Sequence, residues 1–176
     1  MIKIVNAKLA DGSIVDVEIQ DNLISKVSKS SGAKSGEVLD ATGKMLLPGL
    51  VDLHTHLREP GREDAETVLS GSTSAVAGGY TAISSMANTN PVADTAGVVE
   101  QIYRLGKEAG LCDVNPIGAV TKGIKGEHLA ELGAMADSIA AVRIFSDDGN
   151  CVADPLIMRR ALELSLIHIS EPTRRS

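Results

Sequence analysis

The chain has few aromatic residues and few cysteines. Its 176 residues include no tryptophan, two tyrosines and one phenylalanine, which argues against a surface that stacks nucleic-acid bases. Its two cysteines, Cys112 and Cys151, are far apart and form no C-x-x-C motif. This spacing favours free thiols in a cytoplasmic protein over a disulfide framework.

Targeting and membrane signals are also lacking. The opening residues MIKIVNAKLADG contain no basic segment followed by an apolar one, so we expect no secretory signal. No apolar run approaches the ~20 residues that cross a bilayer. Acidic residues outnumber basic ones, 23 to 17, and the net charge is −6. This balance argues against nucleic acid or an anionic membrane as a partner.

Residues 1–47 have the pattern of β-strands. Two runs rich in β-branched residues, 2–5 and 14–19, are separated by the turn signal Asp11-Gly12. Further short strands are predicted at 23–27, 38–40 and 45–47. We expect a small antiparallel layer that is incomplete on its own.

From Pro48 onward, apolar strand-like runs alternate with helix-like segments. The strands are predicted at 50–57, 81–86, 114–120 and 140–145, and the helices at 65–77, 95–109, 127–136 and 155–162. Such alternation indicates parallel strands joined by crossover helices, at a spacing of roughly 30 residues. We predict about four β/α units over residues 48–163. A (β/α)8 barrel takes about 250 residues, so this is about half of one.

The last thirteen residues, 164–176, differ in character from the rest. They resemble the translated read-through of a transposase adaptor used in sequencing libraries, and we expect an artefact tail. The alternative is a fifth strand at 166–169 that carries His168. It would leave no loop after the helix from Pro155, where such connections usually take ~2–6 residues.

Two histidines stand one residue apart in Val51-Asp52-Leu53-His54-Thr55-His56. On a strand, side chains at i and i+2 point to one face, so we expect Asp52, His54 and His56 to lie together. Two imidazoles there can bind one metal ion, and Asp52 could orient one of them. A lone strand histidine is usually a core or edge residue, but this pair predicts a metallohydrolase.

Further motifs follow the histidines in order: Gly78-Gly79-Tyr80-Thr81, Met86-Ala87-Asn88-Thr89 and Phe145-Ser146-Asp147-Asp148-Gly149. With the Asp52-x-His-x-His-x-Arg-Glu-Pro-Gly motif, they resemble the bacterial class I dihydroorotases of the amidohydrolase superfamily. The resemblance covers residues 1 to about 163. It implies a metal-dependent (β/α)8 TIM-type barrel, with residues 1–47 as the N-terminal part of a β-sandwich and 48–163 as the first half of the barrel.

The resemblance also implies the metal ligands. His54 and His56 would bind one zinc ion, and Asp148 would bridge it to a second. A carboxylate at the end of the fourth strand would face the mouth where barrel enzymes keep their sites. Alone, the Asp147-Asp148-Gly149 segment would suggest only a polar turn, and Asp147 is expected to be a turn or supporting residue. Some relatives use a carboxylated lysine as the bridge, but the predicted fourth strand has no lysine.

Two residues are expected to bind substrate. Arg58 follows His56, and arginine holds a carboxylate through two parallel hydrogen bonds. The alternative is a surface arginine paired with Glu59 or Glu63. Asn88 resembles an asparagine that binds the same substrate in the family, although Ala87 stands where the family usually has proline. The alternative for Asn88 is a turn residue.

The implied activity is the reversible hydrolysis of dihydroorotate to carbamoyl aspartate, a step of pyrimidine synthesis. In the family, an aspartate general base and two more zinc histidines follow later strands, and none is in this chain. We therefore assign no catalytic residue and expect residues 1–176 to be inactive and poorly soluble.

Two other functions stay open. Another cyclic amidohydrolase, an allantoinase or hydantoinase, is disfavoured by Arg58, because those substrates lack the carboxylate. A non-catalytic relative that scaffolds aspartate transcarbamoylase is disfavoured because His54, His56 and Asp148 are all present. Aspartate transcarbamoylase and a second copy of the chain are the candidate protein partners.

Overall fold

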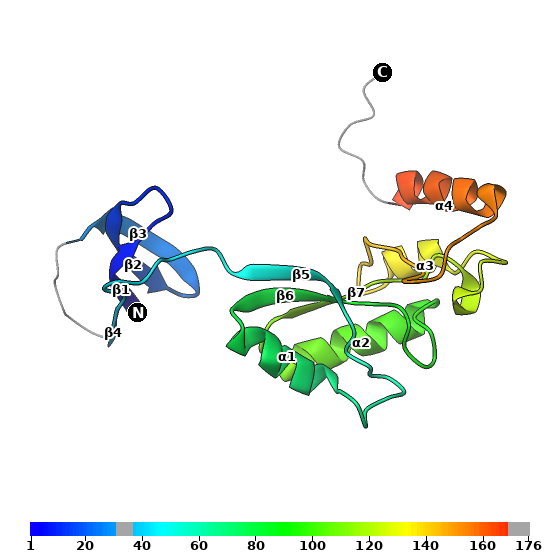
Figure 1. Ribbon diagram of the computed structural model, residues 1–176, viewed down its shortest axis with the longest axis horizontal. Helices are drawn as coiled ribbons and strands as arrows, with labels where there is room; N and C mark the ends of the chain where they lie inside the picture. The colour runs from blue at the N-terminus through cyan, green and yellow to red at the C-terminus, as the bar shows by residue number, and fades with distance from the viewer. Residues whose placement is uncertain (31–36, 169–176) are drawn as a thin grey trace, which may run out of the picture. The chain divides into compact units, whose positions relative to one another are not determined.

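The computed structural model describes residues 1–30 and 37–168 (Figure 1). The chain divides into two compact units, Met1–Pro48 and Gly49–Ser176. Within the described ranges, no helix has both the length and the apolar character that crossing a membrane requires.

The first unit is a four-stranded sheet of β1 (Ile2–Lys8), β2 (Ile14–Gln20), β3 (Leu23–Lys29) and β4 (Glu37–Asp40), in the order β3-β2-β1-β4. The pairs β1–β2 and β2–β3 are antiparallel, as predicted, but β4 is parallel to β1. The prediction of a purely antiparallel layer is therefore wrong for β4. This strand lies at the edge opposite β3, so it cannot continue a hairpin.

The predicted strand at 45–47 is also absent as a strand. It is reduced to a single parallel bridge between Lys8 and Met45. The buried core of this unit is small, and its cluster consists of Ala7, Val15, Val17 and Ala41.

The second unit begins with three parallel strands, β5 (Leu50–Thr55), β6 (Tyr80–Ser85) and β7 (Asp113–Pro116), in the order β5-β6-β7. Two helices make the crossovers, α1 (Val68–Ala77) and α2 (Ala96–Ala109), and both lie on the same face of the sheet (Figure 1). The predicted β/α alternation is thus confirmed for this part of the unit.

Local signals explain where the two helices begin and end. Thr67 caps α1, because its hydroxyl accepts the N–H of Ser70 while the Ser70 hydroxyl accepts the N–H of Thr67. The helix α2 ends at Gly110, which has the left-handed φ of 62° that glycine adopts without strain.

The predicted fourth strand at 140–145 is not formed. One parallel bridge joins Gly118 to Phe145, and the Gly118 N–H donates to the Ile144 carbonyl at 3.1 Å. Two features limit this pairing. The preceding strand ends at Pro116, which has no N–H to donate, and Ala141 has a φ of 46° that interrupts an extended chain.

The remaining helices also differ from the prediction. A 3₁₀ turn at Lys122–Ile124 and α3 (Leu132–Asp137) replace the single helix expected at 127–136. The helix α4 (Pro155–His168) runs past residue 162 and includes residues 164–168 of the expected tail. Residues 169–176 of that tail lie outside the described residues.

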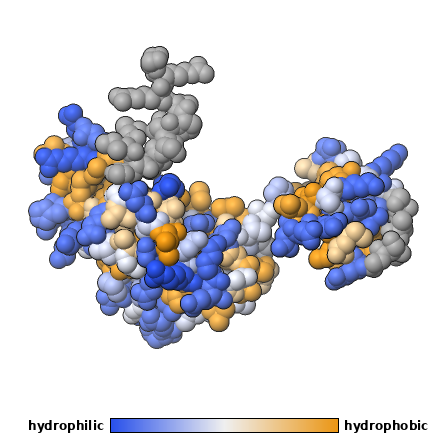
Figure 2. All heavy atoms as spheres, turned by 180° about the vertical axis from the view of Figure 1, so that it is seen from behind, coloured by the Kyte–Doolittle hydropathy of each residue, from blue (hydrophilic) through white to orange (hydrophobic). Residues whose placement is uncertain are grey.

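The two faces of the parallel sheet differ in burial. The face toward α1 and α2 packs into the main core, which includes Ile83, Val99 and Ile102. On the opposite face, Val51 and Leu53 are 58% and 62% exposed and line a groove with Ile144. Figure 2 shows other apolar side chains that reach the surface on both units.

Candidate metal centre

The strand β5 carries a bulge just before its end. Asp52 pairs with Ile83 and Thr55 with Ser85, so three steps on β5 match two on β6. The extra residue breaks the alternation of side chains between the two faces. Asp52 and Thr55 consequently both face the side of α1, where they line a groove with Ser74.

This bulge overturns the expectation that Asp52 shares a face with the histidines and orients one of their rings. Asp52 instead accepts the backbone N–H of His54 at 3.0 Å. The carboxylate thus supports the main chain of the bulge.

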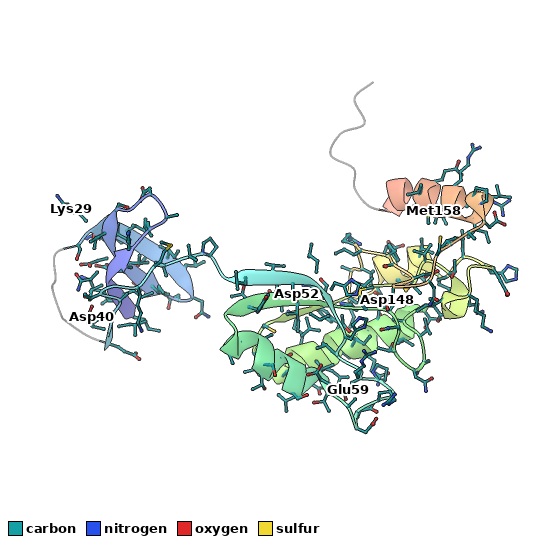
Figure 3. The ribbon with its side chains drawn as sticks, in the orientation of Figure 1. Lys29, Asp40, Asp52, Glu59, Asp148 and Met158 are labelled. Atoms are coloured by element: carbon teal, nitrogen blue, oxygen red, sulfur yellow. The ribbon has the colours of Figure 1, made fainter. Side chains whose placement is uncertain are left out.

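The structure brings His54, His56 and Asp148 together. Asp148 Oδ1 lies 3.1 Å from His54 Nε2 and 4.0 Å from His56 Nε2. One donor atom from each residue lies within 4.8 Å of the others. Figure 3 shows Asp148 near the end of β5, with Glu59 in the loop beyond. All three side chains are open to solvent, with exposed fractions of 59%, 28% and 21%.

This donor set fits a zinc-sized ion. Two imidazoles and a carboxylate are ligands that zinc commonly takes, and tetrahedral bonds near 2.1 Å place neighbouring donors about 3.3 Å apart. The observed separations of 3.1 Å and 4.0 Å lie on either side of that value. The cluster is therefore consistent with metal binding.

Asn88, which follows β6, connects two of these residues. Its Oδ1 lies 3.0 Å from His56 Nδ1, and its Nδ2 donates to Asp148 Oδ2 at 2.9 Å. Since the amide oxygen can only accept, the shared proton belongs to His56 Nδ1. In the neutral ring this tautomer leaves His56 Nε2, which lies 4.0 Å from Asp148 Oδ1, as an acceptor.

The turn that carries Asp148 is held by its neighbour Asp147. The Asp147 side chain is buried, and its Oδ1 accepts the N–H groups of Val120 at 2.8 Å and Thr121 at 3.0 Å. Its Oδ2 accepts the Thr121 hydroxyl. Asp147 is thus a supporting residue of the turn, one of the two roles expected for it.

Thr121 is the residue that the sequence did not single out. It is fully buried, and its hydroxyl also accepts the N–H of Gly126 at 2.9 Å. No motif marks a threonine 26 positions before its partner, so no sequence signal could have identified it.

Arg58 is exposed and stands two residues after His56, with a left-handed φ of 59°. Both suggested carboxylate partners bind backbone groups instead. Glu59 accepts the N–H of Val68 at 2.7 Å and Glu63 accepts that of Gly61 at 2.8 Å. The Gly61 N–H holds the pKa of the Glu63 carboxyl below its ordinary value. Within the described part of the chain, Arg58 forms no ion pair.

The fold and the site together define the class of protein. Parallel β/α units with a His-x-His pair at the end of their first strand form the N-terminal part of a (β/α)8 barrel, preceded by a small β segment. A solved structure of L-hydantoinase (dihydropyrimidinase) from Arthrobacter aurescens superposes with a TM-score of 0.65 and 25% identity, over 82% of this chain and 32% of that chain.

A family model described as "Dihydro-orotase-like" matches residues 43–166. The chain is 62% identical to a dihydroorotase of Streptomyces coelicolor over 157 residues. The aligned region covers 89% of this chain and 37% of that protein. It is 61% identical over 160 residues to a dihydroorotase of Leifsonia xyli, covering 91% and 36%. The chain therefore belongs to the dihydroorotase-like family. It spans little more than a third of the length of these relatives.

Proposed function

We propose that a protein of full family length carrying this chain is a dihydroorotase, which reversibly hydrolyses dihydroorotate to N-carbamoyl-aspartate. The observation that carries the proposal is the convergence of His54, His56 and Asp148, whose donor atoms lie within 4.8 Å of one another. The family relationship supports the choice of a cyclic amide as the substrate.

We propose that these three residues hold zinc. His56 Nε2 of the neutral ring and Asp148 Oδ1 are both acceptors and lie 4.0 Å apart, so a cation between them would satisfy both. When bound, zinc supplies Lewis-acid polarisation of an amide carbonyl. Asp148 would also serve as a ligand of a second zinc ion, as the family resemblance implies.

Arg58 and Asn88 are the proposed substrate-binding residues. The Arg58 guanidinium is exposed and has no carboxylate partner among the described residues, so it is free to make two parallel hydrogen bonds to a substrate carboxylate. Asn88 Nδ2 carries two hydrogens and gives one to Asp148, which leaves the other for a substrate oxygen.

Hydantoin hydrolysis is the second candidate, and the superposition with an L-hydantoinase favours it. Arg58 discriminates between the two, because hydantoin has no carboxylate. The test is an assay of dihydroorotate, hydantoin and allantoin with a protein of full family length and with its Arg58→Met variant. We expect dihydroorotate turnover that falls in the variant through a raised KM. Turnover of hydantoin or allantoin alone would contradict the proposal.

A scaffold without activity is tested separately, by the zinc content of the same protein. We expect bound zinc, whereas a scaffold that has lost its site should contain almost none. Association with a second copy or with aspartate transcarbamoylase, and a cytoplasmic location, stay predictions.

A further inference from the structure

The carboxylate of Asp148 is placed by a turn that has little support from the sheet. Only one bridge, between Gly118 and Phe145, joins this segment to its neighbour. Asp148 itself has a φ of 55°, which is uncommon for a residue other than glycine. Aspartate is among the residues that tolerate this conformation, so the position of the turn depends on its contacts.

Within the turn, the Ser146 hydroxyl accepts the Asp148 N–H and the Asp147 carbonyl accepts the Asn150 N–H, both at 3.0 Å. The contacts that tie the turn to another loop come from Asp147 and Thr121. Asp147 is 5% exposed and accepts three hydrogen bonds, all from Val120 and Thr121. Both residues belong to the loop beyond β7, whereas Asp147 belongs to the turn. The buried carboxylate therefore ties two loops together, and Asp148 is the next residue along the chain.

The Thr121 hydroxyl completes this connection because it both donates and accepts a hydrogen bond. It donates to Asp147 Oδ2 and accepts the N–H of Gly126 at 2.9 Å. The Thr121 side chain has no exposed surface, so water cannot replace either bond without opening the loop. Removing the hydroxyl would leave a buried carboxylate oxygen of Asp147 and the N–H of the half-buried Gly126 without these partners.

We propose that Asp147 and Thr121 are positioning residues of the metal centre, which hold the Asp148 carboxylate opposite His54 at a separation that suits a metal ion. Neither side chain is among the three donors within 4.8 Å of one another. They act through the backbone of the turn. The inference rests on the proposed function, since it requires the three donors to bind metal.

The main test compares Thr121→Val, which keeps the shape of the side chain and removes the hydroxyl, with Thr121→Ser, which keeps the hydroxyl. A protein of full family length carrying this chain is titrated with Co²⁺, and visible absorption reports binding. Removing a group that supports a metal ligand typically weakens affinity by about 10- to 100-fold. We expect a loss of this size for Thr121→Val and affinity near wild type for Thr121→Ser.

A purely structural role is separated from positioning by Val99→Ala. Val99 is fully buried in α2, so this variant lowers stability without touching the turn. We expect its Co²⁺ affinity to match wild type. If Thr121→Val binds Co²⁺ as tightly as wild type, the positioning role is overturned. If the wild-type protein binds neither Co²⁺ nor Zn²⁺, the proposed function is contradicted, and the positioning role, which depends on it, is contradicted as well.

A measurement on the wild-type protein of full family length covers the case in which Thr121→Val does not fold. Coupling is reciprocal, so metal binding should stabilise the contacts that position its ligand. We expect Co²⁺ to slow amide hydrogen exchange at Val120 and Thr121 more than at Val99. Equal slowing at all three positions would overturn the inference.

Discussion

The metal centre draws its donors from two kinds of backbone. His54 and His56 lie at the end of β5, which pairs with β6 on both sides of the bulge between Asp52 and Thr55. Asp148 lies in a turn that has one bridge to the rest of the sheet and is fixed by the buried Asp147 side chain. Strand pairing on both sides of a bulge thus positions one half of the site, and hydrogen bonds from a buried side chain position the other.

The largest expected effect is the loss of a donor from the strand. His56→Ala removes one of three candidate ligands, so Zn²⁺ affinity should fall by more than the roughly 100-fold expected for supporting residues. Isothermal titration of a protein of full family length with Zn²⁺ measures this. The matched control is His128→Ala, which removes an exposed histidine outside the cluster. Equal affinities for the two variants would exclude His56 as a ligand.

Asn88 links the two halves, so its removal should be the next largest effect. Asn88→Ala breaks the hydrogen bonds to His56 and Asp148 and frees both side chains to turn. We expect affinity for Zn²⁺ to fall by about 10- to 100-fold. Asn115→Ala, at an exposed position on β7, is the control and should bind like wild type. An unchanged affinity in Asn88→Ala would show that the two halves are positioned independently.

The bridge between Gly118 and Phe145 can be perturbed by a substitution at Gly118. A Cβ there would lie 2.8 Å from Phe145 Cε1 and 3.0 Å from Met135 Sδ, closer than a carbon normally approaches. Gly118→Ala should therefore destabilise the fold by about 1–3 kcal/mol, measured by denaturant unfolding. It should also weaken Zn²⁺ binding, because Phe145 leads into the turn.

The control is Gly97→Ala in α2, where a Cβ would meet no atom within 4 Å. A helical alanine at this exposed site should raise stability by about 0.5–1 kcal/mol and leave Zn²⁺ affinity unchanged. If Gly118→Ala leaves both quantities unchanged, the bridge does not position the turn.

The contrast between the strand that carries the histidines and the turn that carries Asp148 also explains which features could be predicted from the sequence. Alternation of apolar runs and helix signals located β5, β6, α1 and α2, and resemblance selected His54, His56 and Asp148 as candidate donors. Prediction failed for the strand at 140–145, because Pro116 and the left-handed Ala141 restrict its pairing. Hydrogen bonds between distant residues leave no periodic pattern, so the partnership of Thr121 with Asp147 could not be foreseen.

The smallest effect is expected at the bulge in β5. Variants of Asp52 test whether its carboxylate supports the main chain of His54 or orients the imidazole ring. Asp52→Ala removes the acceptor for the His54 N–H, and a bond of this kind contributes about 0.5–1.5 kcal/mol to stability. Asp52→Asn keeps an oxygen that can accept and should unfold like wild type. Because Asp52 faces α1 and touches the backbone of His54, Asp52→Ala should lower the free energy of unfolding while Zn²⁺ affinity changes much less than in Asn88→Ala. An affinity loss as large as that of Asn88→Ala would mean that Asp52 orients the imidazole after all, and that the strand end depends on side-chain support as much as the turn does.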